Sequence, residues 1–318
     1  PHLRPPAENG TDMVEILSQT ENIRQKLFVA RESRIHPHKD DKILADWNGL
    51  MIAALARGAQ VFDEPAYIRA ASRAMDFIFE SMQTQDGKLL HRYRSGEAGI
   101  EGNVDDYSFV IWALLELYET TFQTIYLRKA IEYHDNLFGN FHDDKNGGLF
   151  FTSRDAEELL TRPKEIYDGA IPSGNSVAFI NSLRIARVTG NTDIGKQAKE
   201  IYRAFQAQAY AMPSAFTQFL CGLDFDFGPS SEVIITGDLK KSDAQAMLSV
   251  LRKNFTPNKV VIFRPEKFDR TDIEDIPPFM RSSSGIHGKA TAYVCTNQTC
   301  NLPTDDPQIM LELLKVRK

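Results

Sequence analysis

The stretch that decides the fold is residues 46–49 (DWNG), a polar group followed directly by the apolar run LMIAALARGAQVF over residues 50–62. The same arrangement returns at residues 105–108 (DDYS), before FVIWALLELYETTF, and at residues 173–176 (SGNS), before VAFINSLRIARVTG. After each run the chain breaks briefly, and a second helix-like segment follows. A helix pair repeated in this way predicts an array of α-hairpins that share one core.

The helical part is predicted to contain about eight helices. The apolar pattern places the first three near residues 12–34, 46–62 and 65–82. The next two repeat the second and third at an offset of 60, near residues 106–122 and 125–142. The last three lie near residues 174–189, 192–210 and 213–226. The first helix of each pair is apolar around most of its circumference, as expected of a buried inner helix, whereas the second is amphipathic. The segments KLLHRYR (88–94) and LFFTS (149–153) are predicted to be short extended arms.

The pattern changes after Gly228-Pro229. The β-branched run SEVIITG, the amphipathic SDAQAMLSVLRKNF and the apolar runs KVVIFRP and ATAYVCT give a β-α-β order, and DPQIMLELLKV predicts a last helix. We therefore expect a mainly α fold, an α/α toroid segment over residues 1–228, with a small α/β region over residues 229–318.

Composition narrows the range of partners. The chain has 37 Lys and Arg against 43 Asp and Glu, a net charge of −6, with no basic block, which argues against nucleic acid and anionic membrane as partners. No apolar stretch approaches the ~20 residues of a membrane span, and no signal peptide is visible. The three cysteines are too few for a disulfide scaffold, so a reducing, cytoplasmic compartment is expected.

Two cysteines, Cys295 and Cys300, have the spacing C-x4-C, which is neither the redox C-x-x-C spacing nor half of a zinc site. We interpret them as a plain pair of thiols. No phosphate loop and no G-x-G-x-x-G motif occurs, and no cofactor is expected.

The polar groups before the inner helices are where chemistry is expected. Inner helices of a toroid present their N-termini at one end, where unpaired N–H groups and the helix dipole favour oxygen-rich ligands. Aromatic rings can cover the apolar face of a sugar, and a carboxylate pair can act as acid and base on a glycosidic bond. The predicted substrate-binding residues are Asp46, Trp47, Asn48, Arg92, Asp105, Tyr107, Tyr167, Ser173 and Asn175.

Within this end, Asp106 and Asp168 are the predicted acid–base pair, His91 is a proton shuttle, and Trp47 and Tyr107 form a stacking platform. Each assignment has a structural alternative. Asp and Ser are favoured helix caps, Asp-Gly favours a turn, and aromatic residues at helical spacing are commonly core residues. His91 lies on the extended arm after Asp86-Gly87, and it reaches a substrate only if that arm folds over the N-terminal ends of the inner helices.

A second histidine pair, His36 and His38, lies beside Asp40 and Asp41. This pattern is compatible with a metal site, but it lacks a clear third ligand, and a surface loop is the favoured interpretation. No metal is therefore assigned.

Four motifs carry a resemblance to a known family: DDKILADWNGLMIAALAR (40–57), DDYSF (105–109), RPKEIYDGAIPSGNS (162–176) and TAYVCTNQTC (291–300). In this order they resemble the YyaL-type proteins, which include the spermatogenesis-associated thioredoxin-like proteins. The resemblance implies a helical toroid similar to the six-hairpin glycosidases and the N-acylglucosamine 2-epimerases. It extends over nearly the whole chain.

Two departures from that family pattern concern completeness. The family's thioredoxin-like domain has no counterpart here, and about four hairpins are visible where six would close the ring, so the resemblance implies the C-terminal part of a longer protein. An open arc would expose inner helices unless the N-terminal remainder of the parent protein or a homo-oligomer contact covers them. The expected ligand is a carbohydrate or other small polyol, with glycoside hydrolysis or sugar epimerisation as the reaction if the chain is an enzyme. The alternative is a non-catalytic scaffold or interaction module of a thioredoxin-domain-containing protein.

Overall fold

The computed structural model describes residues 13–157, 160–266, 284–296 and 299–315. The chain divides into two compact units, residues 1–42 and residues 43–318. The described part of the first unit, residues 13–42, contains one helix, α1 (Met13–Glu32), in which no residue is buried. The helix predicted to end near Arg34 is thus confirmed to within two residues.

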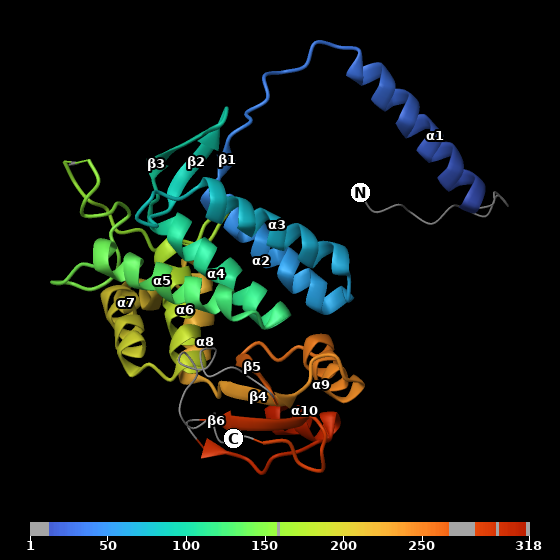
Figure 1. Cartoon of the computed structure of the whole chain (residues 1–318). Helices are drawn as coiled ribbons and strands as arrows, with labels where there is room; N and C mark the ends of the chain where they lie inside the picture. Colours follow the sequence, from blue (N-terminus) through green and yellow to red (C-terminus); the bar gives the residue numbers. More distant parts are fainter. Residues whose placement is uncertain (1–12, 158–159, 267–283, 297–298, 316–318) are drawn as a thin grey trace. The chain divides into compact units, whose positions relative to one another are not determined.

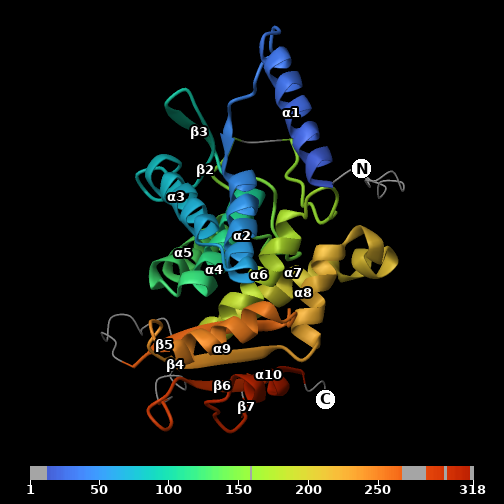
Figure 2. The same ribbon diagram turned by 90° about the vertical axis from the view of Figure 1, so that its right-hand side faces the viewer.

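The second unit begins with three helical hairpins and one further helix. These are α2 (Ala45–Phe62) with α3 (Pro65–Ser81), α4 (Val104–Thr121) with α5 (Thr124–Phe141), α6 (Gly174–Thr189) with α7 (Thr192–Ala211), and α8 (Thr217–Phe227), which follows the 3-10 turn Pro213–Ala215. The inner helices α2, α4, α6 and α8 pack side by side in that order, and each outer helix packs on the inner helix before it (Figures 1 and 2). The predicted array of α-hairpins with α/α-toroid packing is confirmed.

Close packing of the inner helices explains two glycines. A Cβ on Gly49 of α2 would lie 2.7 Å from the backbone carbon of Phe109 in α4. A Cβ on Gly222 of α8 would lie 2.5 Å from the ring of Phe179 in α6. Because real Cβ atoms do not approach so closely, a larger residue at either position would push two inner helices apart.

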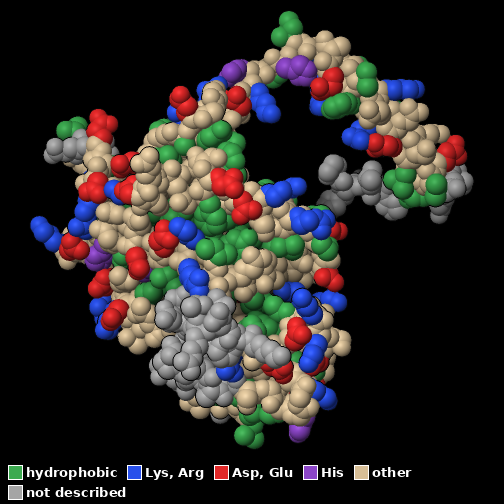
Figure 3. Space-filling model, in the orientation of Figure 1, with side chains coloured by type: hydrophobic (Ala, Val, Ile, Leu, Met, Phe, Trp, Pro, Cys, Tyr) green, Lys and Arg blue, Asp and Glu red, His purple; other side chains and the backbone are tan. Residues whose placement is uncertain are grey.

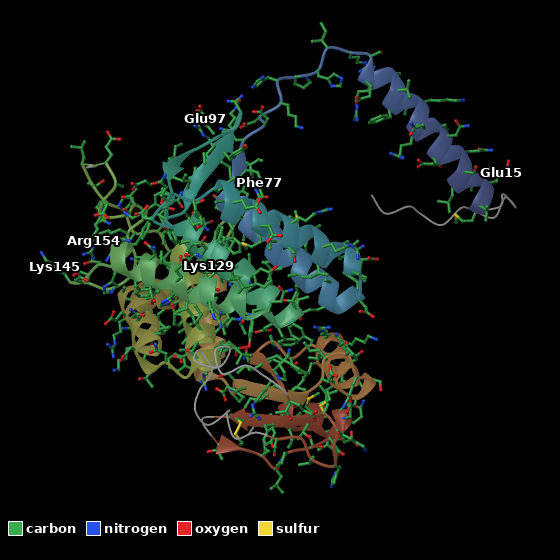
Figure 4. The ribbon with its side chains drawn as sticks, viewed as in Figure 1. Glu15, Phe77, Glu97, Lys129, Lys145 and Arg154 are labelled. Atoms are coloured by element: carbon green, nitrogen blue, oxygen red, sulfur yellow. A yellow bond between two sulfur atoms is a disulfide. The ribbon has the colours of Figure 1, made fainter. Side chains whose placement is uncertain are left out.

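A small antiparallel sheet stands at the N-terminal ends of the inner helices. β2 (Leu90–Arg94) and β3 (Glu97–Glu101) form a hairpin, and β1 (Ile43–Leu44), just before α2, pairs with β2. Tyr93 of β2 packs edge-on against Phe77 of α3, with ring centroids 5.0 Å apart. Phe77 is labelled in Figure 4. The extended arm predicted at residues 88–94 is confirmed.

The second predicted extended arm, at residues 149–153, does not form a strand of a sheet. Only Leu149 takes part in pairing there, in an isolated antiparallel bridge with His142. The Leu149 N–H and carbonyl also bond the side chain of Asn175. Backbone hydrogen bonds of Phe150 with Phe141, and of Phe151 with Pro163 and Val104, hold the rest of the segment.

The α/β region follows the helices. It comprises β4 (Ser231–Gly237), α9 (Ser242–Lys253), β5 (Lys259–Pro265), β6 (Thr291–Thr296), β7 (Thr299–Cys300) and α10 (Pro307–Lys315). Strands β4 and β5 are parallel and joined through α9, β6 is antiparallel to β4, and the sheet order is β5-β4-β6-β7. The predicted β-α-β order and final helix are confirmed.

The sheet of this region is covered on both faces. Alternate residues of β4 point to opposite sides, so Ile234 joins the core of the helical hairpins while Val233 and Ile235 pack with α9 and α10. Arg252 of α9 donates a hydrogen bond to the carbonyl of Thr120 near the end of α4. The α/β region therefore lies at the C-terminal ends of the inner helices, opposite the β1–β3 sheet (Figure 1). The predicted boundary at 228/229 falls between α8 and β4, inside one compact unit, and stays a prediction.

The interpretation of Cys295 and Cys300 as free thiols is wrong, because the two residues form a disulfide. They face each other directly on β6 and β7, where antiparallel pairing brings opposed side chains together. Cys221 on α8 is a free, exposed cysteine.

Among the described helices, none combines the length and apolar character that crossing a bilayer requires. Acidic and basic side chains are intermixed over the face drawn in Figure 3.

Candidate functional site

The polar groups before α2 and α4 meet through one buried carboxylate, that of Asp106. Its Oδ1 accepts a hydrogen bond from the backbone N–H of Asp46 at 3.0 Å, and its Oδ2 accepts one from the N–H of Asn103 at 2.8 Å. The Asn103 side chain in turn accepts from the N–H of Asp106, which completes a capping box at the start of α4. The sequence N-x-x-D at 103–106 is the signal that would have identified Asn103 as the cap.

His91 comes to the same carboxylate from strand β2. Its Nδ1 lies 3.0 Å from both oxygens of Asp106. This contact raises the pKa of His91, because the negative carboxylate stabilises the imidazolium form. The His91 side chain is about a quarter exposed, so Asp106 orients an imidazole that solvent can reach.

Asp46 and Asp105 flank this pair, and both carry raised pKa values. Burial is the main cause in each case, followed for Asp46 by the negative charge of Asp106. For Asp105 the pKa rises to about 7, although the N–H of Gly174 at the start of α6 donates to its carboxylate and opposes the shift. An acid that titrates near neutral pH is suited to exchange a proton with a substrate.

Asp168 has a different setting from the one predicted. Its Oδ1 accepts from the N–H of Ser173 before α6, and its Oδ2 accepts from the N–H groups of Gln218 and Phe219 in α8. Both oxygens are therefore engaged by backbone donors. These donors fix the Asp168 carboxylate, and the direct acid–base role expected for it is not supported. The Asp106 carboxylate is fully buried, with one backbone donor on each oxygen and His91 beside both, and this arrangement suits a positioning role better than the direct acid–base role predicted for it.

Three of the predicted substrate-binding polar residues have side chains that are hydrogen-bonded to the backbone of this chain. Ser173 caps α6 by accepting from the N–H of Ser176. The buried amide of Asn175 bonds the backbone of Leu149 and the carbonyl of Glu165, and the amide of Asn48 donates to the carbonyl of Leu44. These contacts hold loops against the ends of the inner helices, as the capping alternative expected.

The aromatic residues divide into two groups. Trp47, in the first turn of α2, is 61% exposed, and Tyr167 is 67% exposed. Tyr107 is 3% exposed, and its ring packs against Tyr133 and Phe141 of α5. Tyr107 is thus a core residue with no free ring face, in contrast with the stacking role predicted for it.

Arg92 lies on the β1–β3 sheet but does not join the cluster formed by Asp46, His91 and Asp106. Successive residues of a strand point to opposite faces, which places Arg92 on the face opposite His91. Its guanidinium lies beside Gly99 of β3. In the unit of residues 1–42, His36 and Asp40 are exposed, and the closest partner of the His36 ring is the carbonyl of Glu32 at 3.2 Å.

Comparison with known proteins gives relatives at the level of sequence. The chain is 31% identical to human spermatogenesis-associated protein 20 over 321 residues, which cover 97% of this chain and 40% of the relative. It is also 31% identical to the mouse protein of that name and 27% identical to the uncharacterised protein B0495.5 of Caenorhabditis elegans. Its homologues are named spermatogenesis-associated protein 20. The chain spans about 40% of the length of these curated relatives, and no protein-family profile matches it.

Solved structures similar to this chain include sugar-processing enzymes. Cellobiose 2-epimerase from Bacillus thermoamylovorans superposes with a TM-score of 0.45 and 17% identity, over 54% of this chain and 46% of the enzyme. A family 76 α-mannanase from Bacteroides thetaiotaomicron gives a TM-score of 0.45 and 18% identity, over 60% of this chain and 56% of the enzyme.

Proposed function

We propose that this chain binds a carbohydrate at the N-terminal ends of α2, α4 and α6. The observation that carries the proposal is the exposed ring of Trp47, next in sequence to Asp46, whose carboxylate lies in the cluster with His91 and Asp106. An aromatic face beside fixed carboxylates and an imidazole is a surface that can cover the apolar side of a sugar while binding its hydroxyl groups. Tyr167 adds a second exposed ring, next to the residue that ties α6 to α8.

The proposed reaction class is glycoside hydrolysis or sugar epimerisation, with Asp105 and His91 as the groups that exchange protons. Asp105 is half-buried in the first turn of α4, and no Lys or Arg among the described residues forms an ion pair with its carboxylate. His91 is held by Asp106 through Nδ1, which leaves Nε2 free for a substrate. Asp106 and Asp168 act in this proposal as positioning residues that fix the helix ends.

The test is a calorimetric titration of the full chain with a set of mono- and oligosaccharides at millimolar concentration. We expect at least one saccharide to bind, with affinity lost in Trp47→Ala. Phe62→Ala is the matched control, because Phe62 is 73% exposed at the other end of the same helix. Binding that survives Trp47→Ala, or no saccharide binding in any case, would remove the proposal.

The second candidate function is a non-catalytic interaction module. A separate observation favours it: Trp47, Met51 and Val61 form an exposed apolar stripe along α2. The positions 60 residues later in α4 include Tyr107 and Ile111, which are buried. An assembly that is lost in Met51→Lys would favour the interaction module. If the chain binds no saccharide and Met51→Lys leaves its solubility and monodispersity unchanged, neither candidate function fits.

A further inference from the structure

Three potential ligand atoms converge in the cluster described above. One atom each from Asp46, His91 and Asp106 lies within 4.8 Å of the others. The three residues come from separate elements, α2, β2 and α4. Backbone N–H groups of Asp46 and Asn103 fix the Asp106 carboxylate, and pairing with β1 fixes the strand that carries His91. Ligand atoms about 3 Å apart, as found for His91 Nδ1 and the Asp106 oxygens, match neighbouring ligands at metal–ligand distances near 2.1 Å.

The charge balance of this site points to a cation. Asp46 is 7% exposed and Asp106 is fully buried, with Asp105 beside them. Within the described ranges no Lys or Arg forms an ion pair with any of these carboxylates, and the positive partner in reach is the imidazole of His91. The hydrogen bonds to the Asp46 carboxylate come from backbone N–H groups of its own first turn, of Asp46 and Trp47. A single imidazole facing several buried carboxylates leaves negative charge uncompensated, which is costly because burial removes the water that stabilises that charge.

We propose that Asp46, His91 and Asp106 bind one divalent transition-metal ion of the Zn²⁺ or Mn²⁺ class. One imidazole nitrogen and two carboxylates form a donor set that such ions accept, whereas Ca²⁺ and Mg²⁺ prefer oxygen ligands alone. The metal takes the place of the proton shared by His91 and Asp106, so in the metal-bound form Asp105 is the group left to exchange protons. With three protein ligands, at least one coordination position would remain for water or a hydroxyl-bearing ligand.

The experiment measures metal binding by the full chain directly. The protein is stripped with EDTA and dialysed against Zn²⁺, Mn²⁺ or Ca²⁺, and bound metal is counted by elemental analysis. We expect one equivalent of Zn²⁺ or Mn²⁺ per chain. We also expect at least a tenfold loss of affinity in His91→Ala and in Asp46→Asn, because the loss of a residue that only supports a metal ligand already costs about ten- to a hundredfold. His91→Gln, checked by circular dichroism, serves if His91→Ala fails to fold.

Two control variants separate this site from other histidines. His142 also contacts two carboxylates, those of Asp144 and Glu200, so His142→Ala is the matched control and should bind metal as the wild type does. The double variant of His36 and His38 to Ala removes the histidine pair near residue 37 and should also retain binding. Loss of metal in either control with retention in His91→Ala would overturn the assignment.

A second readout uses Trp47, which is next to Asp46. In a Trp112→Phe background Trp47 is the remaining tryptophan of the chain, and paramagnetic Mn²⁺ bound at Asp46 should quench its fluorescence. No binding of Zn²⁺ or Mn²⁺, or tighter binding of Ca²⁺ than of both, would refute the proposal. The inference does not depend on a carbohydrate: saccharide binding that persists in EDTA separates failure of this site from failure of the proposed function.

Discussion

Replacing Asp105 by Asn should stabilise the protein at alkaline pH more than at acidic pH. The pKa of the Asp105 carboxyl is raised from 3.8 to about 7 in the folded state, mainly because burial disfavours its charge. A raised carboxyl pKa means that the folded state holds a proton that the unfolded state has already lost. Stability therefore falls as pH rises from the unfolded pKa to the folded pKa.

The size of the effect follows from these two values. The penalty for the wild type is about 2 kcal/mol at pH 5.5 and about 4 kcal/mol at pH 8, since one pKa unit corresponds to roughly 1.4 kcal/mol. Asn removes the charge but keeps an oxygen that can accept from the N–H of Gly174. The stability gain of Asp105→Asn over the wild type should thus be about 2 kcal/mol larger at pH 8 than at pH 5.5.

Urea unfolding followed by circular dichroism at these two pH values, in EDTA, measures the difference. Glu165→Gln is the control, because it removes an exposed carboxylate that also acts on Asp105 while leaving Asp105 ionisable. The stability gain of Glu165→Gln over the wild type should change far less with pH than that of Asp105→Asn. If Asp105→Asn gave the same gain at both pH values, or destabilised the protein more at pH 8, the assignment of a buried, proton-holding Asp105 would be refuted.

Further perturbations test the other contacts. Asp106→Asn should lower the pKa of His91 towards its ordinary value, because the negative charge that raises it is gone; an NMR titration of His91 that shows no fall would contradict the pairing. Asp168→Ala should cost about 3 kcal/mol or more in unfolding free energy, since three backbone N–H groups lose their acceptor, and a near-neutral urea midpoint would argue against this anchoring role. Gly49→Ala should cost about 2 kcal/mol or more because α2 and α4 cannot separate freely; a calorimetric melting temperature equal to the wild type would speak against the close approach. Reduction of the Cys295–Cys300 disulfide should lower stability by about 2 kcal/mol, and identical unfolding curves with and without reductant would show that it contributes nothing.

Part of the site was accessible to sequence reasoning. The polar groups at residues 46–49, 105–108 and 173–176 were expected at one end of the inner helices. Asp46 and Asp106 do meet there. His91 could be placed on an extended arm, but its contact with Asp106 requires β2 to pair with β1 directly before α2. A pairing between segments about fifty residues apart leaves no local signature.

The roles within the site were the part that needed the fold. Asp105 and Asp106 are adjacent and chemically identical. Asp106 accepts from two backbone N–H groups and contacts His91, whereas Asp105 accepts from the N–H of Gly174 and has its pKa raised to about 7, mainly by burial. Asp168 carried a turn signal, but its hydrogen bonds to α8 depend on residues fifty positions away. Tyr107 aligns with Trp47 in the repeat, but Tyr107 is buried under α5 whereas Trp47 is exposed.

The sequence by itself determined the helices, their pairing in hairpins and the β-α-β order, because apolar periodicity, caps and turn residues act within a few positions of each other. Only the tertiary structure decided which carboxylate is a structural anchor and which can exchange a proton. That choice depends on which backbone N–H groups and which neighbouring charges surround each carboxylate, and these come from segments distant in the chain.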